Sequence, residues 1–286
     1  MTVRDILNES TKALEAVDIP SARLDAEVLL SFCLGCDRLE FYKNPDMTIS
    51  ETKLAAFRNL IARRLQWEPV AYITGRKEFW TFVLEVNSSV LIPRPDTEII
   101  VEEALDVYLN FNSLPVRILD IGTGSGAIAL ALAHEIADAK VVATDISQAA
   151  LSLAQKNAAT LGLQDKIDFK LGNLFEPVDG LFDIIVSNPP YIAAAEYEEL
   201  PAGVRNFEPC EALFAGENGL EFYEKLINQA APYLKKNGWL LLEIGAKQEA
   251  GIRRIMEATG NYDSMEMRRD YAGLPRVIKA RRKVSG

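Results

Sequence analysis

Apolar residues follow a helical period in the first quarter of this chain and strand-like patterns after it. In residues 1–71 they recur every three or four positions, which indicates amphipathic helices. Ser21 and Ser50 stand where the N-caps of two of these helices are expected. No polar cluster in this stretch is typical of catalysis. We therefore interpret residues 1–71 as a small helical bundle that serves recognition or packing.

Residues 72–92 have a different pattern, rich in aromatic and β-branched side chains. Residues 79–86 and 90–92 have the composition of short strands, and the polar residues 87–89 between them indicate a turn. The sequence therefore predicts a β-hairpin that links the helical bundle to the rest of the chain. Two prolines follow it, and a new helix is expected to begin near Asp96.

Strand and helix patterns alternate through most of residues 93–286. The expected strands cover residues 116–121, 140–144, 167–171, 183–187 and 239–244, and the expected helices cover residues 126–137, 147–161 and 219–234. Such alternation predicts an α/β fold, with a parallel sheet and helices on both of its faces. Ligands of such folds bind at the carboxyl ends of the strands, so the residues that follow each strand are the candidates for chemistry.

A glycine turn closes the first of these strands and opens the helix after it. It consists of Gly122, Thr123, Gly124, Ser125 and Gly126. Its G-x-G-x-G spacing differs from the G-x-G-x-x-G of dinucleotide-binding folds, and the preceding Asp120 would repel a pyrophosphate but favour a ligand with an ammonium group. Asp145 ends the second strand, where an acidic side chain can accept hydrogen bonds from both hydroxyls of a ribose. A ribose with a cationic amino-acid tail describes S-adenosylmethionine, which we expect as the cofactor.

A second motif, Asn188-Pro189-Pro190-Tyr191, follows the fourth strand. The two prolines make a stiff loop whose polar groups are mostly acceptors, namely the Pro189 carbonyl and the Asn188 amide oxygen. With the flat ring of Tyr191, such a loop suits a planar group that carries an NH2: two acceptors take its hydrogens and the ring stacks on its face. The motif alone is equally compatible with a rigid exit from the strand.

Together the two motifs predict methyl transfer to a held NH2 group. The nitrogen of an amide or exocyclic amine is a poor nucleophile, because its lone pair is delocalised. Fixing both hydrogens directs that lone pair at the methyl group, which is catalysis by orientation and needs no histidine base.

Size and composition match an ordinary globular protein, with 286 residues, 49% hydrophobic and 25% charged. No apolar stretch reaches membrane-spanning length and the first residues do not resemble a signal peptide, so we expect no membrane contact and a cytoplasmic location. Three cysteines do not make a disulfide framework, and with a single histidine, His134, we expect no metal site.

The formal net charge of −10 disfavours a nucleic-acid partner, which usually requires a basic surface. One cationic cluster lies near the C-terminus and comprises Arg268, Arg269, Arg276, Lys279, Arg281, Arg282 and Lys283. Protection of an exposed sheet edge by charge is one explanation of this cluster, and a local basic patch is the other.

Five stretches together resemble a known family. They are residues 91–98 (Leu-Ile-Pro-Arg-Pro-Asp-Thr-Glu), the glycine turn, residues 188–192 (Asn-Pro-Pro-Tyr-Ile), Glu208-Pro209 with Ala212-Leu213, and residues 270–273 (Asp-Tyr-Ala-Gly). In these the chain is similar to the protein-(glutamine-N5) methyltransferases that modify peptide chain release factors, and the similarity runs from the N-terminal helices to the C-terminus.

The resemblance implies a seven-stranded, Rossmann-like class I methyltransferase domain over residues 93–286, with an antiparallel last strand pair. It implies that residues 1–71 recognise the release factor and that residues 72–92 are a β-hairpin linker. The expected substrate is the glutamine of the Gly-Gly-Gln motif in bacterial class 1 release factors, that is, peptide chain release factors 1 and 2. Its side-chain N5 would receive the methyl group and S-adenosyl-L-homocysteine would be released. We expect a monomer.

By the same resemblance, Gly122 to Gly126 and Asp145 bind the methyl donor. Asn188, Pro189, Pro190 and Tyr191 hold the glutamine amide, with Asn188 also near the donor. After the third strand the family commonly has an acidic residue and then an aromatic one near the adenine. This chain has Asn173 and Leu174 there, and Phe175 is the candidate for the missing ring.

Two other functions fit some of these features. An adenine-N6 or guanine-N2 methyltransferase acting on DNA or RNA would present the same NH2 geometry, but it would need base flipping and a basic channel. A non-catalytic protein that binds S-adenosylmethionine is the other, and the intact Asn188 and Tyr191 argue against it.

Overall fold

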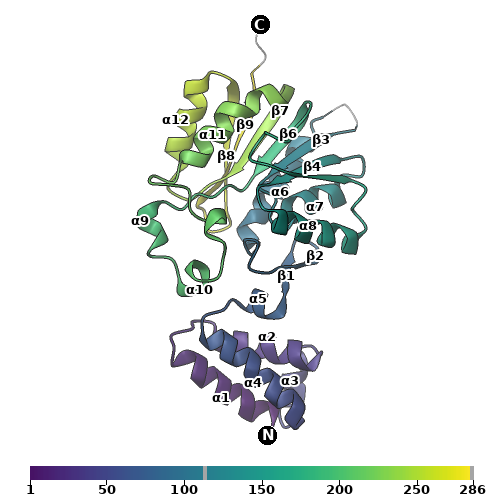
Figure 1. Cartoon of the computed structure of the whole chain (residues 1–286), viewed down its shortest axis with the longest axis vertical. Coiled ribbons are helices and arrows are strands. Elements are labelled where there is room, and N and C mark those ends of the chain that lie inside the picture. Colours follow the sequence, from purple (N-terminus) through teal and green to yellow (C-terminus); the bar gives the residue numbers. More distant parts are fainter. Residues whose placement is uncertain (112–114, 284–286) are drawn as a thin grey trace. The chain divides into compact units, whose positions relative to one another are not determined.

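The computed structural model describes residues 1–111 and 115–283, which cluster into two compact units (Figure 1). Met1–Arg76 and the short segment Pro201–Phe207 form the first, called here the N-terminal unit. Lys77–Leu200 and the chain from Glu208 onward form the second, called here the α/β unit.

Helices make up the N-terminal unit. They are α1 (Val3–Glu15), α2 (Ala22–Leu34), α3 (Leu39–Lys43), α4 (Glu51–Leu65), α5 (Val70–Thr74) and the short α10 (Ala202–Arg205). Ser50 caps α4 as predicted, since its side chain accepts a hydrogen bond from the Lys53 N–H. Ser21 occupies the N-cap position of α2, but its side chain caps no backbone N–H. A reciprocal cap at the start of α1 was not predicted: Thr2 and Asp5 each accept a hydrogen bond from the other's backbone N–H.

The β-hairpin is present, but its turn lies elsewhere than predicted. Strands β1 (Arg76–Phe79) and β2 (Phe82–Glu85) are joined at Trp80 and Thr81. The prediction of one strand over residues 79–86 is therefore wrong, and residues 90–92 form no strand. The chain does turn at residues 87–89, where the Val90 N–H donates to the Asn87 carbonyl at 3.2 Å, but this turn does not join the two strands of the hairpin. Trp80 adopts a φ of 56°, and its backbone N–H donates to Glu98 Oε1 at 2.8 Å. The turn lacks the Gly, Pro or Asn that marks such positions in a sequence.

The α/β unit is built on one seven-stranded sheet. Its strands are β3 (Arg117–Ile121), β4 (Lys140–Asp145), β5 (Ile167–Leu171), β6 (Phe182–Ser187), β7 (Leu234–Glu243), β8 (Tyr262–Arg269) and β9 (Pro275–Arg282). Their order is β5-β4-β3-β6-β7-β9-β8. Strands β3 to β7 run parallel and β9 is antiparallel to both of its neighbours, which confirms the predicted sheet and the implied antiparallel end.

Helices cover both faces of this sheet (Figure 1). The helices of the unit are α6 (Glu98–Tyr108), α7 (Ala127–Glu135), α8 (Gln148–Leu161), α9 (Ala194–Tyr197), α11 (Glu221–Ala230) and α12 (Glu249–Thr259), with 3-10 turns η1 (Pro95–Thr97), η2 (Cys210–Ala212) and η3 (Ala231–Tyr233). Strand β7 begins at Leu234, earlier than the predicted residue 239. The polar residues 235–237 hid its start from the hydrophobic pattern.

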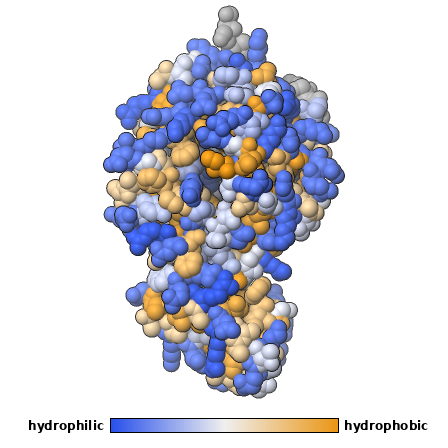
Figure 2. Space-filling view, viewed as in Figure 1, coloured by the Kyte–Doolittle hydropathy of each residue, from blue (hydrophilic) through white to orange (hydrophobic). Residues whose placement is uncertain are grey.

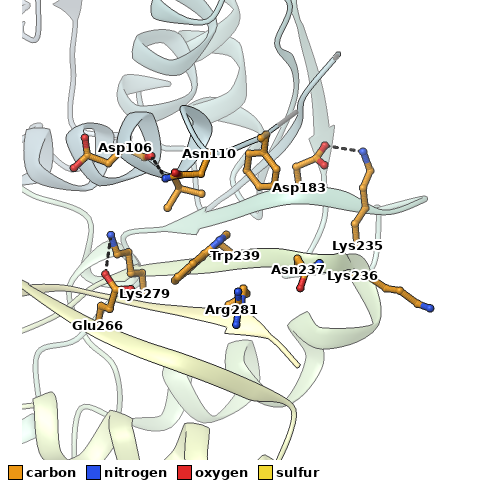
Figure 3. Close-up of a pocket in the computed structure, with 12 residues that line it drawn as sticks. Asp106, Asn110, Asp183, Lys235, Lys236, Asn237, Trp239, Glu266, Lys279 and Arg281 are labelled. Carbon is orange, nitrogen blue, oxygen red and sulfur yellow. Dashed lines mark hydrogen bonds and ion pairs between the residues drawn. The ribbon is translucent and has the colours of Figure 1, made fainter. Parts of the chain in front are cut away.

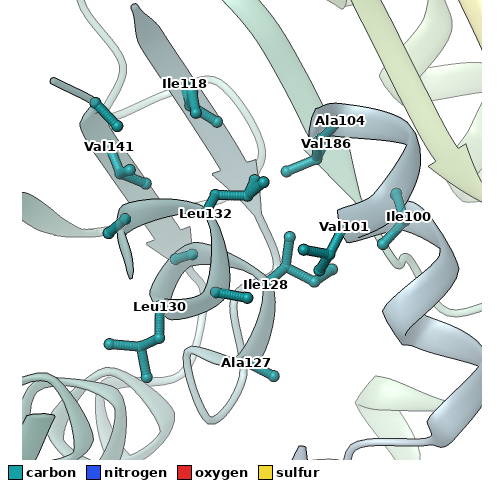
Figure 4. Close-up of a cluster of buried hydrophobic side chains, with 14 of the residues drawn as sticks. Ile100, Val101, Ala104, Ile118, Ala127, Ile128, Leu130, Leu132, Val141 and Val186 are labelled. Carbon is teal, nitrogen blue, oxygen red and sulfur yellow. The ribbon is translucent and has the colours of Figure 1, made fainter. Parts of the chain in front are cut away.

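The core lies in two layers, one on each side of the sheet. On one side, Ile100 of α6 and Ile128 of α7 lie in the same cluster as Val186 of β6 (Figure 4). On the other, Tyr223 of α11 and Met256 of α12 lie in a cluster with residues of β3, β6 and β7. Every residue of β6 is buried, as expected for a central parallel strand covered on both faces. Strand order reverses between β3 and β6, which is where ligands bind in such sheets.

The cationic cluster near the C-terminus lies on the β8 and β9 edge and is largely paired. Lys279 lies 2.7 Å from Glu103, Arg276 3.0 Å from Asp270, and Arg281 3.0 Å from Asp263. The pairing favours the explanation in which charge protects a sheet edge. Hydrophilic residues cover much of the visible face of the α/β unit (Figure 2). Among the helices of residues 1–111 and 115–283, none is both long and apolar enough to span a bilayer.

Candidate active site

The strand register brings both motifs to one edge of the sheet. Ile121, just before the glycine turn, pairs with Ser187, just before Asn188. Ile121 also pairs with Thr144, just before Asp145. The Ser187 hydroxyl donates to the Ile121 carbonyl at 2.7 Å, which fixes the two strand ends side by side. Since neighbouring strands lie about 4.8 Å apart, the three motif positions meet at adjacent strand ends.

The glycine turn has free space at its first glycine and close packing at its last. Gly122 has a φ of 75°, and a Cβ built there would meet no atom within 4 Å. Gly126 has a φ of 86°, and a Cβ there would lie 3.1 Å from Leu130 Cδ1 and 3.2 Å from Ala154 Cβ. Both positions therefore favour glycine. Gly126 allows α7 and α8 to pack closely, and Gly122 leaves free space in which a ligand can approach the backbone.

Asp145 ties this turn to the end of β4. Its Oδ2 accepts a hydrogen bond from Gly124 N–H and its Oδ1 accepts one from Ser147 N–H, both at 2.9 Å. Each carboxylate oxygen can accept a second hydrogen bond. The side chain is half-buried, so these remaining lone pairs are available to hydroxyl groups of a ligand above the turn.

Asp120 lies beneath the turn. It is 1% exposed, and its Oδ2 accepts a hydrogen bond from the Thr123 hydroxyl at 2.7 Å. Its Oδ1 is buried, and no hydrogen-bond partner for it is found among residues 1–111 and 115–283. Burial raises the pKa of Asp120 to about 7, and the Thr123 hydrogen bond opposes that shift. When Asp120 is ionised, its negative charge beneath the turn favours a cationic group above it.

Asn157 of α8 secures the turn from the side and was missed from the sequence. It is 3% exposed, and its Nδ2 donates to the carbonyls of Ser125, at 2.9 Å, and Glu85, at 3.0 Å. Its Oδ1 accepts a hydrogen bond from the Glu85 N–H at 2.8 Å. One side chain thus joins the glycine turn, β2 and α8. A polar residue on the inward face of a helix is the only signal of this role in the sequence.

The Asn188 side chain points to the stretch before α6. Its Nδ2 donates to the Thr97 hydroxyl at 3.3 Å. With the nitrogen turned toward Thr97, the Oδ1 acceptor points away from Thr97 and can accept a hydrogen bond from a ligand. Pro189 is buried, and Pro190 and Tyr191 are half-buried. Burial raises the pKa of the Tyr191 hydroxyl, so the ring is neutral, and its backbone carbonyl is held by Gln248 Nε2 at 2.9 Å.

Residues 92–98 form a wall beside Asn188 because carboxylates anchor them. Glu208 accepts hydrogen bonds from Ile92 N–H at 3.0 Å and from the Arg94 guanidinium at 2.5 Å. Asp96 lies 3.1 Å from the Arg276 guanidinium of β9. Among the stretches that carry the family resemblance, residues 91–98 therefore contact both Glu208 and Asn188.

The residues expected near an adenine ring differ in accessibility. Asn173 is exposed and Leu174 half-buried, whereas Phe175 is 2% exposed and stacks on Tyr233 with ring centroids 4.7 Å apart. Phe175 therefore belongs to the core, and the expectation that it supplies a ring to the ligand is wrong. Ile146, directly after Asp145, is 68% exposed and offers an apolar surface that the sequence did not single out.

A cavity of about 690 Å³ lies at the other ends of the strands, near the starts of β6 and β7 and away from the two motifs (Figure 3). Trp239 lines it, Lys235 pairs with Asp183 at 2.7 Å, and Lys279 pairs with Glu266 at 3.2 Å. None of the residues predicted for the site lines this cavity. In the part of the chain that the structure describes, no group of three or more Cys, His, Asp or Glu side chains is arranged to hold a metal ion.

Known proteins match both parts of the chain. Residues 5–75 match the family described as the PrmC N-terminal domain, and residues 103–202 match the methyltransferase small domain. A release factor glutamine methyltransferase of Koribacter versatilis is 40% identical over 287 residues, covering 100% of both chains. One of Geobacter sulfurreducens is 42% identical over 281 residues, covering 98% of this chain and 96% of the relative.

The fold is also similar to solved structures. A crystal structure of a methyltransferase from Pyrococcus furiosus is 21% identical, covers 70% of this chain and 89% of that chain, and gives a TM-score of 0.52. The class I methyltransferase fold implied by the sequence is thereby confirmed.

Proposed function

This chain belongs to the release factor glutamine methyltransferases, and from that premise we propose that it methylates the Gly-Gly-Gln glutamine of bacterial peptide chain release factors 1 and 2. The methyl group goes to the side-chain N5 of that glutamine. S-adenosylmethionine is the methyl donor. The observation that carries the proposal is the pairing of Ile121 with Ser187, which puts the glycine turn and Asn188 at neighbouring strand ends.

We propose that the glycine turn, Gly122 to Gly126, and Asp145 hold the donor. The open space above Gly122 and the unpartnered Asp120 oxygen below the turn fit a ligand with a cationic tail. Asp145 would accept hydrogen bonds from the ribose hydroxyls. The adenine would lie near Asn173 and Leu174, with the exposed Ile146 against it. When bound, S-adenosylmethionine supplies an electrophilic methyl carbon.

The loop Asn188 to Tyr191 would hold the glutamine amide. Asn188 Oδ1 and the Pro189 carbonyl would accept its two hydrogens, and the ring of Tyr191 would stack on its plane. Pro190 keeps the loop stiff, so little ordering is needed on binding. Fixed in this way, the amide nitrogen directs its lone pair at the methyl carbon, and it needs no general base before transfer. After transfer the nitrogen is acidic and loses its proton to solvent or to a nearby carbonyl.

We propose that residues 1–71 recognise the release factor, that residues 72–92 link them to the enzyme, and that residues 93–286 carry out the transfer. The match of residues 5–75 to the PrmC N-terminal domain supports this division. Large apolar side chains are exposed on α2 and α3, among them Leu39 at 62% and Tyr42 at 64%, as a protein-binding surface requires.

The test is to incubate the protein with isotope-labelled S-adenosylmethionine and a purified release factor, and to locate the label by peptide mass spectrometry. We expect it on the glutamine of the Gly-Gly-Gln peptide. A release factor with that glutamine changed to alanine should stay unlabelled, and Asn188→Ala should lose turnover while donor binding weakens less. Label on RNA or DNA in place of the protein would refute the proposal and favour the nucleic-acid alternative.

A further inference from the structure

Thr97 lies between the side chains of Asn188 and Glu243. It is 4% exposed and accepts a hydrogen bond from Asn188 Nδ2 at 3.3 Å. The carboxyl group of Glu243, the last residue of β7, lies near the same hydroxyl, and hydrogen bonding by Thr97 opposes the rise in the pKa of Glu243 that burial causes. Strand pairing makes this arrangement rigid, because Leu242 pairs with Ser187 and Glu243 with Val277.

The position of Glu243 does not favour the stability of the fold. It is 1% exposed, and its Oε2 is buried with no hydrogen-bond partner in the part of the chain that the structure describes. A buried, half-satisfied carboxyl group costs free energy, so a residue of this kind at a ligand-binding edge indicates a role in the site.

The direction of the hydrogen bonds among these three side chains is fixed by what each group can do. An ionised carboxylate only accepts, so the single hydroxyl hydrogen of Thr97 goes to Glu243. Thr97 then has only lone pairs to offer Asn188. The Asn188 amide must therefore turn its NH2 toward Thr97, and its oxygen faces the other way.

We propose that Thr97 and Glu243 are positioning residues, which hold the Asn188 amide with its oxygen toward the substrate amide. This rests on the proposed function, in which Asn188 Oδ1 accepts a hydrogen of the glutamine NH2. A flipped Asn188 would present its own NH2 to that group. Two donors would then face each other, and the glutamine nitrogen would lose its fixed orientation.

Protonation of Glu243 removes the preference for this orientation of the Asn188 amide. A protonated carboxyl group can itself donate to Thr97, which frees the Thr97 hydrogen to donate to Asn188 Oδ1 and stabilises the flipped amide. Burial raises the pKa of Glu243 to about 7, against the Thr97 hydrogen bond that lowers it. The charged and titratable groups around it are Arg276, Asp96, Arg94, Tyr191 and Tyr223. Turnover should therefore fall as the pH drops through neutrality.

The experiment compares the parent with Thr97→Val, Thr97→Ser and Glu243→Gln in full-length protein. It measures kcat and KM with a purified release factor, and the donor Kd by calorimetry. Thr97→Val keeps the side-chain shape without the hydroxyl and should lower kcat by roughly 10- to 100-fold while the donor Kd stays unchanged. Thr97→Ser should restore most of that loss. Glu243→Gln keeps the volume but can donate, so it should be slow at every pH and lack the acidic fall of the parent.

Three results with the variants, and one with the parent, would overturn the inference. Turnover of Thr97→Val equal to that of the parent removes the role of the hydroxyl. Loss of donor binding in Thr97→Val and Thr97→Ser alike shows a merely structural role, as does a parent-like acidic fall in Glu243→Gln. If the parent itself leaves the glutamine unlabelled, the proposed function fails and this inference with it. If the parent labels the glutamine and Thr97→Val turns over as fast as the parent, the inference fails while the proposed function stands.

Discussion

Replacing Asn157 by alanine is expected to loosen the glycine turn and destabilise the fold together. The change removes three hydrogen bonds, at 2.8, 2.9 and 3.0 Å, from a side chain that is 3% exposed. Each contributes about 1 kcal/mol net, and the carbonyl of the buried Ser125 would lose the hydrogen bond from Asn157. We therefore expect the free energy of unfolding to fall by about 3 kcal/mol.

The neighbouring Lys156 provides a matched control. It lies on the same helix and reaches the same strand residue, since its Nζ lies 2.6 Å from Glu85 Oε1. Both side chains of that ion pair are exposed, at 61% and 43%, so Lys156→Ala should change stability by less than about 1 kcal/mol.

Urea unfolding followed by circular dichroism gives both stabilities, and calorimetry gives the affinity for S-adenosylmethionine. Asn157→Ala should weaken donor binding, because the Ser125 carbonyl belongs to the turn that we propose holds the donor. Lys156→Ala should bind it as the parent does. The reasoning is refuted if the two variants lose the same small amount of stability, or if Asn157→Ala is unstable yet binds the donor normally once folded.

Two further changes test the charges at the site. Asp145→Ala should weaken donor binding about 100-fold or more, since two ribose hydroxyls would each lose a hydrogen bond to a charged group, and each such bond contributes about 1.5–3 kcal/mol. Calorimetry measures this, and an unchanged Kd would contradict the ribose assignment. Asp120→Asn should flatten the dependence of stability on pH. The folded-state pKa of about 7 lies above the ordinary 3.8, so the parent binds more protons folded than unfolded and loses stability as pH rises between those values. Melting temperatures at mildly acidic and alkaline pH should therefore differ less in Asp120→Asn, and an undiminished difference would count against the buried charge.

The sequence was sufficient for features that a short stretch determines by itself. Glycines at residues 122 and 126 predict a turn, and prolines at residues 189 and 190 predict a stiff loop. The alternation of patterns between residues 116 and 244 determines the order of strands and helices. Because the carboxyl ends of parallel strands share one edge of a sheet, these local features also predicted that the two motifs meet.

Features that depend on distant partners could not be predicted. Asn157 bonds Glu85, 72 residues away, and Asn188 bonds Thr97, 91 residues away. Nothing in the local pattern tells which polar residue will be buried against which. The turn at Trp80 was misplaced for the same reason, since Glu98, 18 residues further on, holds its backbone. Phe175 has an aromatic ring close to the position expected for an adenine contact. Only the structure reveals that the ring is buried and stacks on Tyr233, so it is not accessible to a ligand.

The segment Pro201–Phe207 has a practical consequence for anyone who divides this enzyme. It clusters with the helices of Met1–Arg76, although the residues on either side of it belong to the α/β unit. A Cβ on Gly203 would come within 2.8 Å of the Trp67 carbonyl, so the two stretches fit closely. Cutting the polypeptide after Arg76 would remove the helices with which Pro201–Phe207 clusters, while Leu200 and Glu208 on either side of that segment stay in the α/β unit. A shortened enzyme would therefore have to be trimmed in two places, and an inactive product of a single cut would say nothing about substrate recognition.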